Sequence, residues 1–188
     1  RTMDADKVRD VAMTAYWQGD PADVSVNAIC QMAGVSKPSL YRAFGSEDGL
    51  TRAVLDSYAE RVLSSVFAIL HGGMDLRDTL AALIDFASAD PRMETGCVFY
   101  KMRAGRHRLG PATRARVDEI DATAQQAIAA FLRSRRDAGD WPDGLPVEAA
   151  AKYLGEQFAL AITQRASGED TAHVREMMTL ALSVFTRS

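Results

Sequence analysis

Residues 36–42, SKPSLYR, hold the side chains whose types and spacing could do chemistry. Lys37 and Arg42 are cations, and Ser39 and Tyr41 carry hydroxyl groups that donate and accept hydrogen bonds. Such side chains bind phosphate oxygens, and Lys or Arg also pairs with the acceptor atoms on the edge of guanine. The segment can therefore bind a nucleic acid, provided that the elements around it turn these side chains outward.

Two short helices with a sharp turn between them are predicted around this segment. Ser25 is placed to cap the first helix, and Gly34 falls where a helix ends in a left-handed residue, with Val35 packing back near its last turn. Ser36 can cap the second helix, and Pro38 lies in its first turn, where a missing N–H group costs nothing. The spacing is typical of a helix-turn-helix, whose second helix enters the major groove of DNA.

The second helix has one face for packing and one for contact. Leu40, Ala43 and Phe44 share the inner face, on which Leu40 and Phe44 are expected to anchor the helix onto Ile29 and Ala33. The side chains left to face outward are Lys37, Ser39, Tyr41 and Arg42. Tyr41 could instead be a packed aromatic, although Leu40 and Phe44 already fill the inner face.

The whole chain is predicted to be all-α, with about nine helices, because helix-forming residues dominate and alternating strand patterns are nearly absent. A long helix is expected over residues 47–70, and the last two helices over residues 147–166 and 171–186. We expect a helix-turn-helix domain over residues 1–46 and an effector-binding and dimerisation domain over residues 47–188, with the helix 47–70 as the lever that connects them.

The stretch 25–50, SVNAICQMAGVSKPSLYRAFGSEDGL, resembles the signature of the TetR/AcrR family of bacterial one-component transcriptional regulators. The similarity includes the Ala-Gly-Val-Ser turn, Leu40-Tyr41, Phe44, and the Ser46 and Leu50 that open the next helix. It implies a homodimer that binds a palindromic double-stranded DNA operator, represses transcription and is released by a small-molecule effector. The DNA contacts that the resemblance implies are Ser25, Lys37, Pro38, Ser39, Tyr41 and Arg42.

Helical facing suggests where the two other partners would bind. The expected effector pocket is lined by Tyr58, Val62, Phe86, Cys97, Tyr100, Ile128 and Gln157. The expected dimer interface, on the last two helices, is formed by Leu154, Phe158, Ala161, Met177, Met178, Ala181 and Phe185. The alternative is that these apolar residues form a purely internal core.

The charge of the chain argues against nucleic-acid binding and keeps an alternative open. The net charge is -3, and Glu47, followed by Asp48, stands where members of the family that the stretch resembles usually carry a Lys that meets a phosphate. The N-terminal region sets Arg1, Lys7, Arg9, Lys37, Arg42 and Arg52 against Asp4, Asp6, Asp10, Asp20, Asp23, Glu47 and Asp48. Either Arg1, Lys7 or a preceding basic arm supplies the phosphate contact, or the chain is a helical ligand-binding or adaptor protein with weak or lost DNA binding.

A second basic stretch and Cys97 also permit two interpretations each. The stretch contains Lys101, Arg103, Arg106, His107, Arg108, Arg114 and Arg116. It could be a second nucleic-acid surface or the anchor of an anionic effector, but a solvated face or loop is the commoner role of such a run.

Cys97 could sense oxidants or electrophiles, but a buried, inert thiol fits its apolar context better.

Other function classes find little support in the pattern. His71, His107 and His173 have no partners at metal-ligand spacing, and no catalytic set can be argued from spacing, so we expect no metal, no cofactor and no enzyme. No apolar run approaches the length of a membrane span, and no leader pattern opens the chain. We therefore expect a cytoplasmic protein that has no membrane partner.

Overall fold

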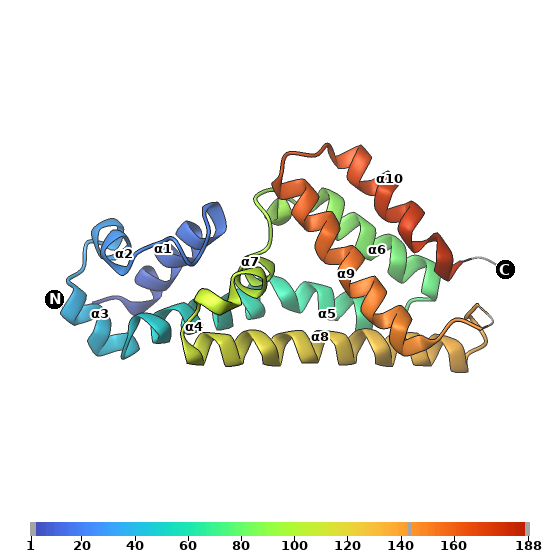
Figure 1. Cartoon of the computed structure of the whole chain (residues 1–188), viewed down its shortest axis with the longest axis horizontal. Helices are drawn as coiled ribbons and strands as arrows, with labels where there is room; N and C mark the ends of the chain where they lie inside the picture. Colours follow the sequence, from blue (N-terminus) through green and yellow to red (C-terminus); the bar gives the residue numbers. More distant parts are fainter. Residues whose placement is uncertain (1–2, 143, 187–188) are drawn as a thin grey trace. The chain divides into compact units, whose positions relative to one another are not determined.

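The computed structural model describes residues 3–142 and 144–186, and it is helical throughout (Figure 1). Within these ranges there is no strand, which confirms the predicted all-α fold. The α-helices are α1 Ala5–Gln18, α2 Val26–Ala33, α3 Lys37–Phe44, α4 Glu47–Tyr58, α5 Ser64–His71, α6 Leu76–Ala89, α7 Val98–Ala104, α8 Pro111–Asp137, α9 Val147–Ala166 and α10 Thr171–Leu182.

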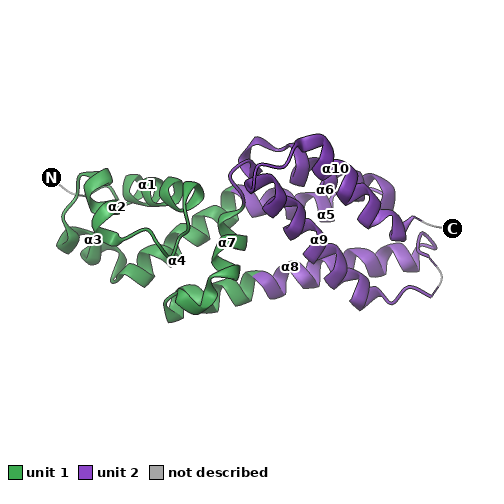
Figure 2. Ribbon diagram, turned by 45° about the horizontal axis from the view of Figure 1, so that its top comes forward, with its two compact units in different colours: residues 1–61, 97–120 green, residues 62–96, 121–188 purple. Residues whose placement is uncertain are grey.

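The chain forms two compact units, coloured separately in Figure 2. Unit 1 contains residues 1–61 and 97–120, and unit 2 contains residues 62–96 and 121–188. The segment 97–120, which carries α7 and the start of α8, therefore packs with the N-terminal helices. Residues 1–46 are the part of unit 1 that holds the helix-turn-helix, and the functional division between residues 46 and 47 stays a prediction.

Unit 1 is built on apolar side chains from α1, α2, α3 and α4. Val8, Ile29, Leu40 and Leu50 are each at most 1 % exposed, which places all four helices around one core. The hydroxyl groups of Tyr16 on α1 and Thr51 on α4 are hydrogen-bonded at 3.1 Å inside this core. This core thus holds α2 and α3 against α1 and α4.

The predicted helix 47–70 is interrupted, which corrects the sequence interpretation. Residues Ala59–Leu63 form a π-helical turn between α4 and α5, and α5 continues to His71 before Gly72 and Gly73. A π turn holds one residue more than an α turn, so the side chains after it face another direction than a continuous α-helix predicts. If α4, the π turn and α5 are counted together as one interrupted helix, the described residues contain nine helices, in agreement with the prediction.

Unit 2 is a helical bundle in which α6, α9 and α10 pack side by side (Figure 1). Its core contains Leu83 of α6, Leu154 and Ile162 of α9, and Val174 of α10, all at most 3 % exposed. The last helix was expected to reach residue 186, but α10 ends at Leu182 and a 3-10 turn, Ser183–Phe185, follows. None of the described helices combines the length and apolarity that crossing a bilayer requires.

Candidate nucleic-acid interface

The turn between α2 and α3 has the geometry that the sequence predicts. Gly34 adopts φ 69° and ψ 37°, a left-handed conformation that a side chain disfavours. Its N–H donates to the Gln31 carbonyl (3.3 Å), and the Val35 N–H donates to the Cys30 carbonyl (3.0 Å). This pair of hydrogen bonds is a Schellman motif, which ends α2 and redirects the chain into α3.

The start of α3 is capped by hydroxyl groups. The Ser36 hydroxyl accepts a hydrogen bond from the Ser39 N–H (3.3 Å) and lies 2.9 Å from the Ser39 hydroxyl. Leu40 is fully buried and anchors the helix. The inner face is narrower than expected, because Ala43 is exposed and Phe44 is half-buried.

The remaining side chains of α3 face outward, as the helix-turn-helix interpretation requires. Lys37, Pro38 and Arg42 are exposed, while Ser39 and Tyr41 are partly exposed. The Lys37 ammonium lies 5.7 Å from the centroid of the Tyr41 ring, within the range of a cation–π contact. Within residues 3–142 and 144–186, neither Lys37 nor Arg42 forms an ion pair, so both charges stay available to a ligand.

Ser25 and Lys7 lie on the helices that pack beside α3. Ser25 is exposed and caps α2, where its hydroxyl accepts from the Ala28 N–H (3.2 Å). Lys7 is exposed on α1 and lines a groove of about 370 Å³ together with Ser36 and Ser39 at the start of α3. Asp4 lines the same groove. That Lys7 supplies a phosphate contact in place of Glu47 stays a prediction, and Arg1 lies outside the described residues.

The acidic residues of the N-terminal region are mostly engaged inside unit 1. Asp6 pairs with Arg9, and Asp10 pairs with Arg61 at 2.7 Å. Asp4 caps α1 by accepting from the Asp6 and Lys7 N–H groups, each at 3.1 Å. Of these partners, Arg61 is not among the cations counted in the N-terminal region, so its pair with Asp10 compensates one of the negative charges set against DNA binding.

Asp20 and Asp23, in the turn between α1 and α2, are compensated by the second basic stretch. Arg108 forms an ion pair with Asp20 at 3.3 Å and a shorter one with Asp23. Lys101 donates to the carbonyl oxygens of Trp17 and Gly19 at the end of α1, and its burial lowers the pKa of the ammonium.

Other cations of the same stretch hold their own helix in place. Arg116 pairs with Asp56 of α4 at 2.6 Å, and Arg106 pairs with Asp118. The stretch therefore has a structural role that spacing did not indicate: it binds the carboxylates and carbonyl groups of unit 1.

Asp48 is also engaged, and by a helix far along the chain. Its carboxylate accepts from the Ala112 N–H (2.8 Å), the Thr113 N–H (3.0 Å) and the Thr113 hydroxyl (2.6 Å) at the start of α8. Burial by itself raises the pKa of the Asp48 carboxyl, but the hydrogen bonds from Thr113 and Ala112 outweigh it and the pKa is lowered. Glu47, in contrast, is exposed.

The residues predicted for an effector pocket are divided between the two units. Tyr58 and Cys97 are buried in unit 1, where Tyr100 is partly exposed. Unit 2 contains Val62, Phe86, Ile128 and Gln157, of which Val62 and Phe86 are buried. The predicted pocket stays a prediction.

Cys97 is 2 % exposed, and burial raises the pKa of its thiol. A thiol that is both buried and protonated reacts slowly, which favours the inert interpretation of this residue.

The predicted dimer residues are mostly part of the core of unit 2. Five of the seven are buried within the chain: Leu154, Phe158, Ala161, Met178 and Phe185. Met177 is 43 % exposed and Ala181 is intermediate. The large apolar side chains that α9 and α10 do expose are Tyr153, Leu160, Met177 and Leu180, and their positions follow from the helix register after the core face is assigned.

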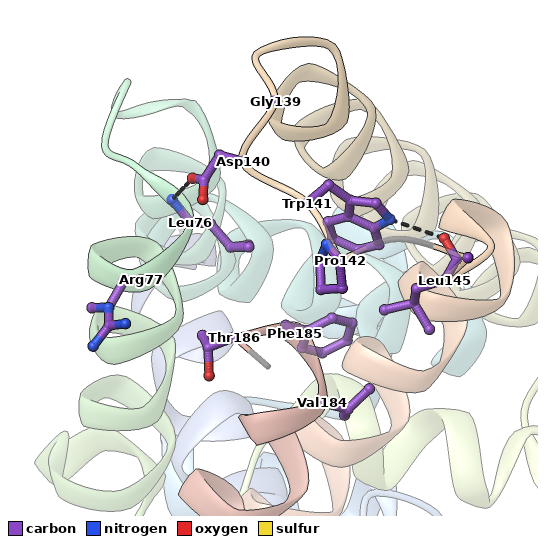
Figure 3. Close-up of a pocket in the computed structure, with 11 residues that line it drawn as sticks. Leu76, Arg77, Gly139, Asp140, Trp141, Pro142, Leu145, Val184, Phe185 and Thr186 are labelled. Carbon is purple, nitrogen blue, oxygen red and sulfur yellow. Dashed lines mark hydrogen bonds between the residues drawn. The ribbon is translucent and has the colours of Figure 1, made fainter. Parts of the chain in front are cut away.

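A cavity of about 900 Å³ lies in unit 2 between the start of α6, the loop before α9 and the end of α10 (Figure 3). Its polar groups already serve the fold: the Asp140 carboxylate accepts from the Leu76 N–H (3.1 Å), and the Trp141 indole N–H donates to the Leu145 carbonyl (2.9 Å). The described residues that line it include none of the predicted effector-pocket residues. Among the described residues, no group of three or more His, Cys, Asp or Glu side chains is arranged to hold a metal ion.

Comparisons of sequence assign the N-terminal region to a known family. Residues 8–54 match the model of the bacterial regulatory proteins, tetR family. The HTH-type transcriptional repressor ComR of Escherichia coli (strain K12) is 26% identical over 166 residues, which cover 82% of this chain and 75% of ComR. The uncharacterized HTH-type transcriptional regulator Rv1255c of Mycobacterium tuberculosis is 36% identical over 58 residues, or 31% of this chain and 29% of that protein.

Solved structures share the fold along almost the whole chain. The reduced form of NemR from E. coli has a TM-score of 0.82 at 15% identity and covers 96% of each chain. A cysteine mutant of CifR, solved with a 26-bp double-strand operator DNA, has a TM-score of 0.81 at 20% identity and covers 98% of each chain. A regulator from Agrobacterium tumefaciens has a TM-score of 0.83 at 19% identity, with 96% of each chain covered.

The family match falls on the same helices whose turn, caps and outward cations make the candidate interface, and the likeness in fold extends beyond them. The sequence relatives are described as transcriptional regulators, which agrees with the expectation that the chain is not an enzyme. Residues 8–54 therefore match the tetR family of bacterial regulatory proteins, and the chain as a whole shares the fold of the solved regulators.

Proposed function

We propose that the chain binds operator DNA through α3, as a homodimer that represses transcription until a small-molecule effector releases it. The observation that carries the proposal is the exposure of Lys37 and Arg42 on a helix whose opposite face is anchored by Leu40. ComR is described as a repressor, and CifR was solved with operator DNA, which supports the same role here.

In this proposal each outward side chain has a part in binding. Lys37 and Arg42 contact either guanine edges or phosphates, whereas Ser25 and Tyr41 contact phosphates. Pro38 and Ser39 lie in the first turn of α3, the part of a recognition helix that meets base edges. The compensation of Asp10, Asp20 and Asp23 by arginines favours DNA binding over the adaptor alternative, because it reduces the negative potential that opposes approach.

The exposed apolar surface of α9 and α10 is the proposed dimer interface. Leu160 is 49 % exposed and Leu180 is 65 % exposed, and both lie beside a small groove between the two helices. A two-fold axis through this surface would bring two copies of each helix together. Two recognition helices that lie about 34–36 Å apart can then occupy successive major grooves.

Release requires an effector that binds the DNA-free geometry more tightly than the DNA-bound geometry. We propose that it binds among Tyr58, Val62, Phe86, Cys97, Tyr100, Ile128 and Gln157 and acts on α3 through α4 and α5. The protein that works in this way would be cytoplasmic, with access both to DNA and to metabolites.

Selection of DNA tests the proposal without knowledge of the regulated gene. Duplexes bound by the purified protein would be enriched from a random-sequence pool and sequenced. The proposal expects two half-sites of the same sequence in inverted orientation. Failure to enrich any sequence at low salt would support the adaptor alternative instead.

A further inference from the structure

The contact between Asp48 and the start of α8 has no part in the function proposed so far. Asp48 is the second residue of α4, and it satisfies the free N–H groups of Ala112 and Thr113 in the first turn of a helix that starts more than sixty positions later. The Thr113 hydroxyl donates to the Asp48 carboxylate at 2.6 Å and lies 3.1 Å from the backbone carbonyl oxygen of Asp48. Thr113 is fully buried, so this contact is closed to water on one side.

The two helix ends approach so closely that the residue before α8 has no room for a side chain. A Cβ atom at Gly110 would lie 2.3 Å from the Asp48 Cγ atom. Only glycine at this position allows the carboxylate to reach the N–H groups beyond it.

The first turn of α4 is packed equally closely against the end of α3. A Cβ atom at Gly49 would lie 2.0 Å from the Phe44 carbonyl oxygen, and the Gly49 N–H donates to the Ser46 hydroxyl (2.9 Å). A shift of the α4 start relative to α8 would therefore move the end of α3 with it.

We propose that Asp48 is a positioning residue for operator binding: by capping α8, its carboxylate holds the first turn of α4, and hence α3, in the orientation that reads DNA. This inference rests on the proposed function and adds a residue to it that does not itself touch DNA. It also explains why an acid at this position is compatible with a DNA-binding domain.

The proposal and simple electrostatics predict opposite changes in DNA affinity when the Asp48 carboxylate is removed. Removal of a carboxylate from a surface near phosphates should tighten DNA binding, because less negative charge opposes the approach. Removal of a carboxylate that positions α3 should weaken it. Glu47 is the matched control, because it is the adjacent carboxylate, is exposed, and has no part in the α8 cap.

The experiment compares Asp48→Asn, Thr113→Val and Glu47→Gln in the full-length protein, with a duplex enriched by the wild-type protein as the probe. Dissociation constants would be measured by fluorescence anisotropy at 25 °C and corrected for the active fraction by stoichiometric titration. We expect Asp48→Asn to weaken binding about tenfold, and Thr113→Val to weaken it in the same direction without any change of charge. Glu47→Gln should tighten binding roughly twofold.

The controls separate positioning from stability. Thr113→Ser retains the hydroxyl group and should restore wild-type affinity, and a double variant of Asp48→Asn and Thr113→Val should lose less than the sum of the two singles. If Asp48→Asn does not fold, Thr113→Val and Thr113→Ser test the same contact. Tighter binding by Asp48→Asn, or unchanged binding by Thr113→Val, overturns the inference, whereas a wild-type protein that enriches no duplex overturns the proposed function and the inference with it.

Discussion

Arg108 and Asp48 show at the residue scale how charge is distributed in unit 1. Arg108 comes from a stretch that resembles a second nucleic-acid surface, yet it forms ion pairs with Asp20 and Asp23. Asp48 stands at a position that suggests weak DNA binding, yet it caps α8. A count of charges in the N-terminal region therefore overstates its uncompensated negative charge.

The capping contact of Asp48 should make a contribution to stability that depends on pH. The pKa of this carboxyl is lowered in the folded protein, so the contribution is complete above the pKa of the unfolded chain and is lost as pH falls through the folded pKa. We expect the difference in melting temperature between wild type and Asp48→Asn to be constant from pH 8 to about pH 5 and to shrink below about pH 4. A difference that grows on acidification would show that the carboxylate is not stabilised by α8.

The two thiols should be unreactive in the folded protein. Cys97 and Cys30 are 2 % and 8 % exposed, so both sulfur atoms are shielded from a reagent, and burial also raises the pKa of the Cys97 thiol. Reaction with a chromogenic disulfide should release no thiolate within minutes under native conditions and about two equivalents after unfolding in guanidinium. Fast native modification of Cys97 would instead favour the sensor interpretation.

Leu40 should account for much of the attachment of α3. It is fully buried, whereas Phe44 is half-buried and Ala43 is exposed. Leu40→Ala should lower the free energy of unfolding by about 2–5 kcal/mol, as measured by urea denaturation. Ala43→Ser, at an exposed position of the same helix, serves as the control and should change it by less than about 0.5 kcal/mol.

At the scale of elements, local chemistry predicts where helices begin and end. Ser25, Ser36 and Ser46 each cap a helix through the hydroxyl group, and Gly34 has the left-handed conformation expected from its place after Ala33. These features depend only on residues a few positions away in the chain, so they can be predicted from the local sequence.

Other features depend on contacts that a local pattern does not contain. The π turn Ala59–Leu63 has the sequence AERVL, which is ordinary for an α-helix, so nothing in the residue types marks the extra residue. The pairing of Arg108 with Asp20 joins residues 88 positions apart. For the same reason, facing arguments on α9 and α10 found the apolar residues but could not tell the core face from the exposed one.

The left-handed turn before α3 should be sensitive to any side chain. Gly34→Ala keeps open space around the new methyl group but forces a residue with a Cβ atom to φ 69°. We expect a loss of about 1–2 kcal/mol in the free energy of unfolding, measured by urea denaturation. Gly105→Ala is the matched control, because Gly105 has φ -91° and its new Cβ atom would make an ordinary contact. Equal losses in the two variants would contradict the role of backbone conformation.

At the scale of the whole molecule, the account depends on two copies of the chain. Leu160→Glu or Leu180→Glu would place a charge in the proposed interface and should convert the dimer to a monomer in sedimentation velocity. Met32→Glu is the control, because Met32 is 54 % exposed on α2 and lies in unit 1, away from α9 and α10 in the chain. Dimers that persist in both leucine variants would place the interface elsewhere.

The central claim is that Lys37 and Arg42 bind operator DNA, and one measurement tests it most directly. Binding of the enriched duplex would be followed by fluorescence anisotropy across a salt series for wild type, for Lys37→Ala/Arg42→Ala, and for Arg77→Ala/Lys152→Ala. The last variant removes the same charge from exposed positions of unit 2.

We predict tight, salt-sensitive binding by wild type and by the unit 2 variant. We also predict a loss of more than about tenfold in Lys37→Ala/Arg42→Ala, with a salt slope smaller by about 1 for each phosphate contact removed. Equal binding by all three proteins, or none by wild type at low salt, would contradict the account.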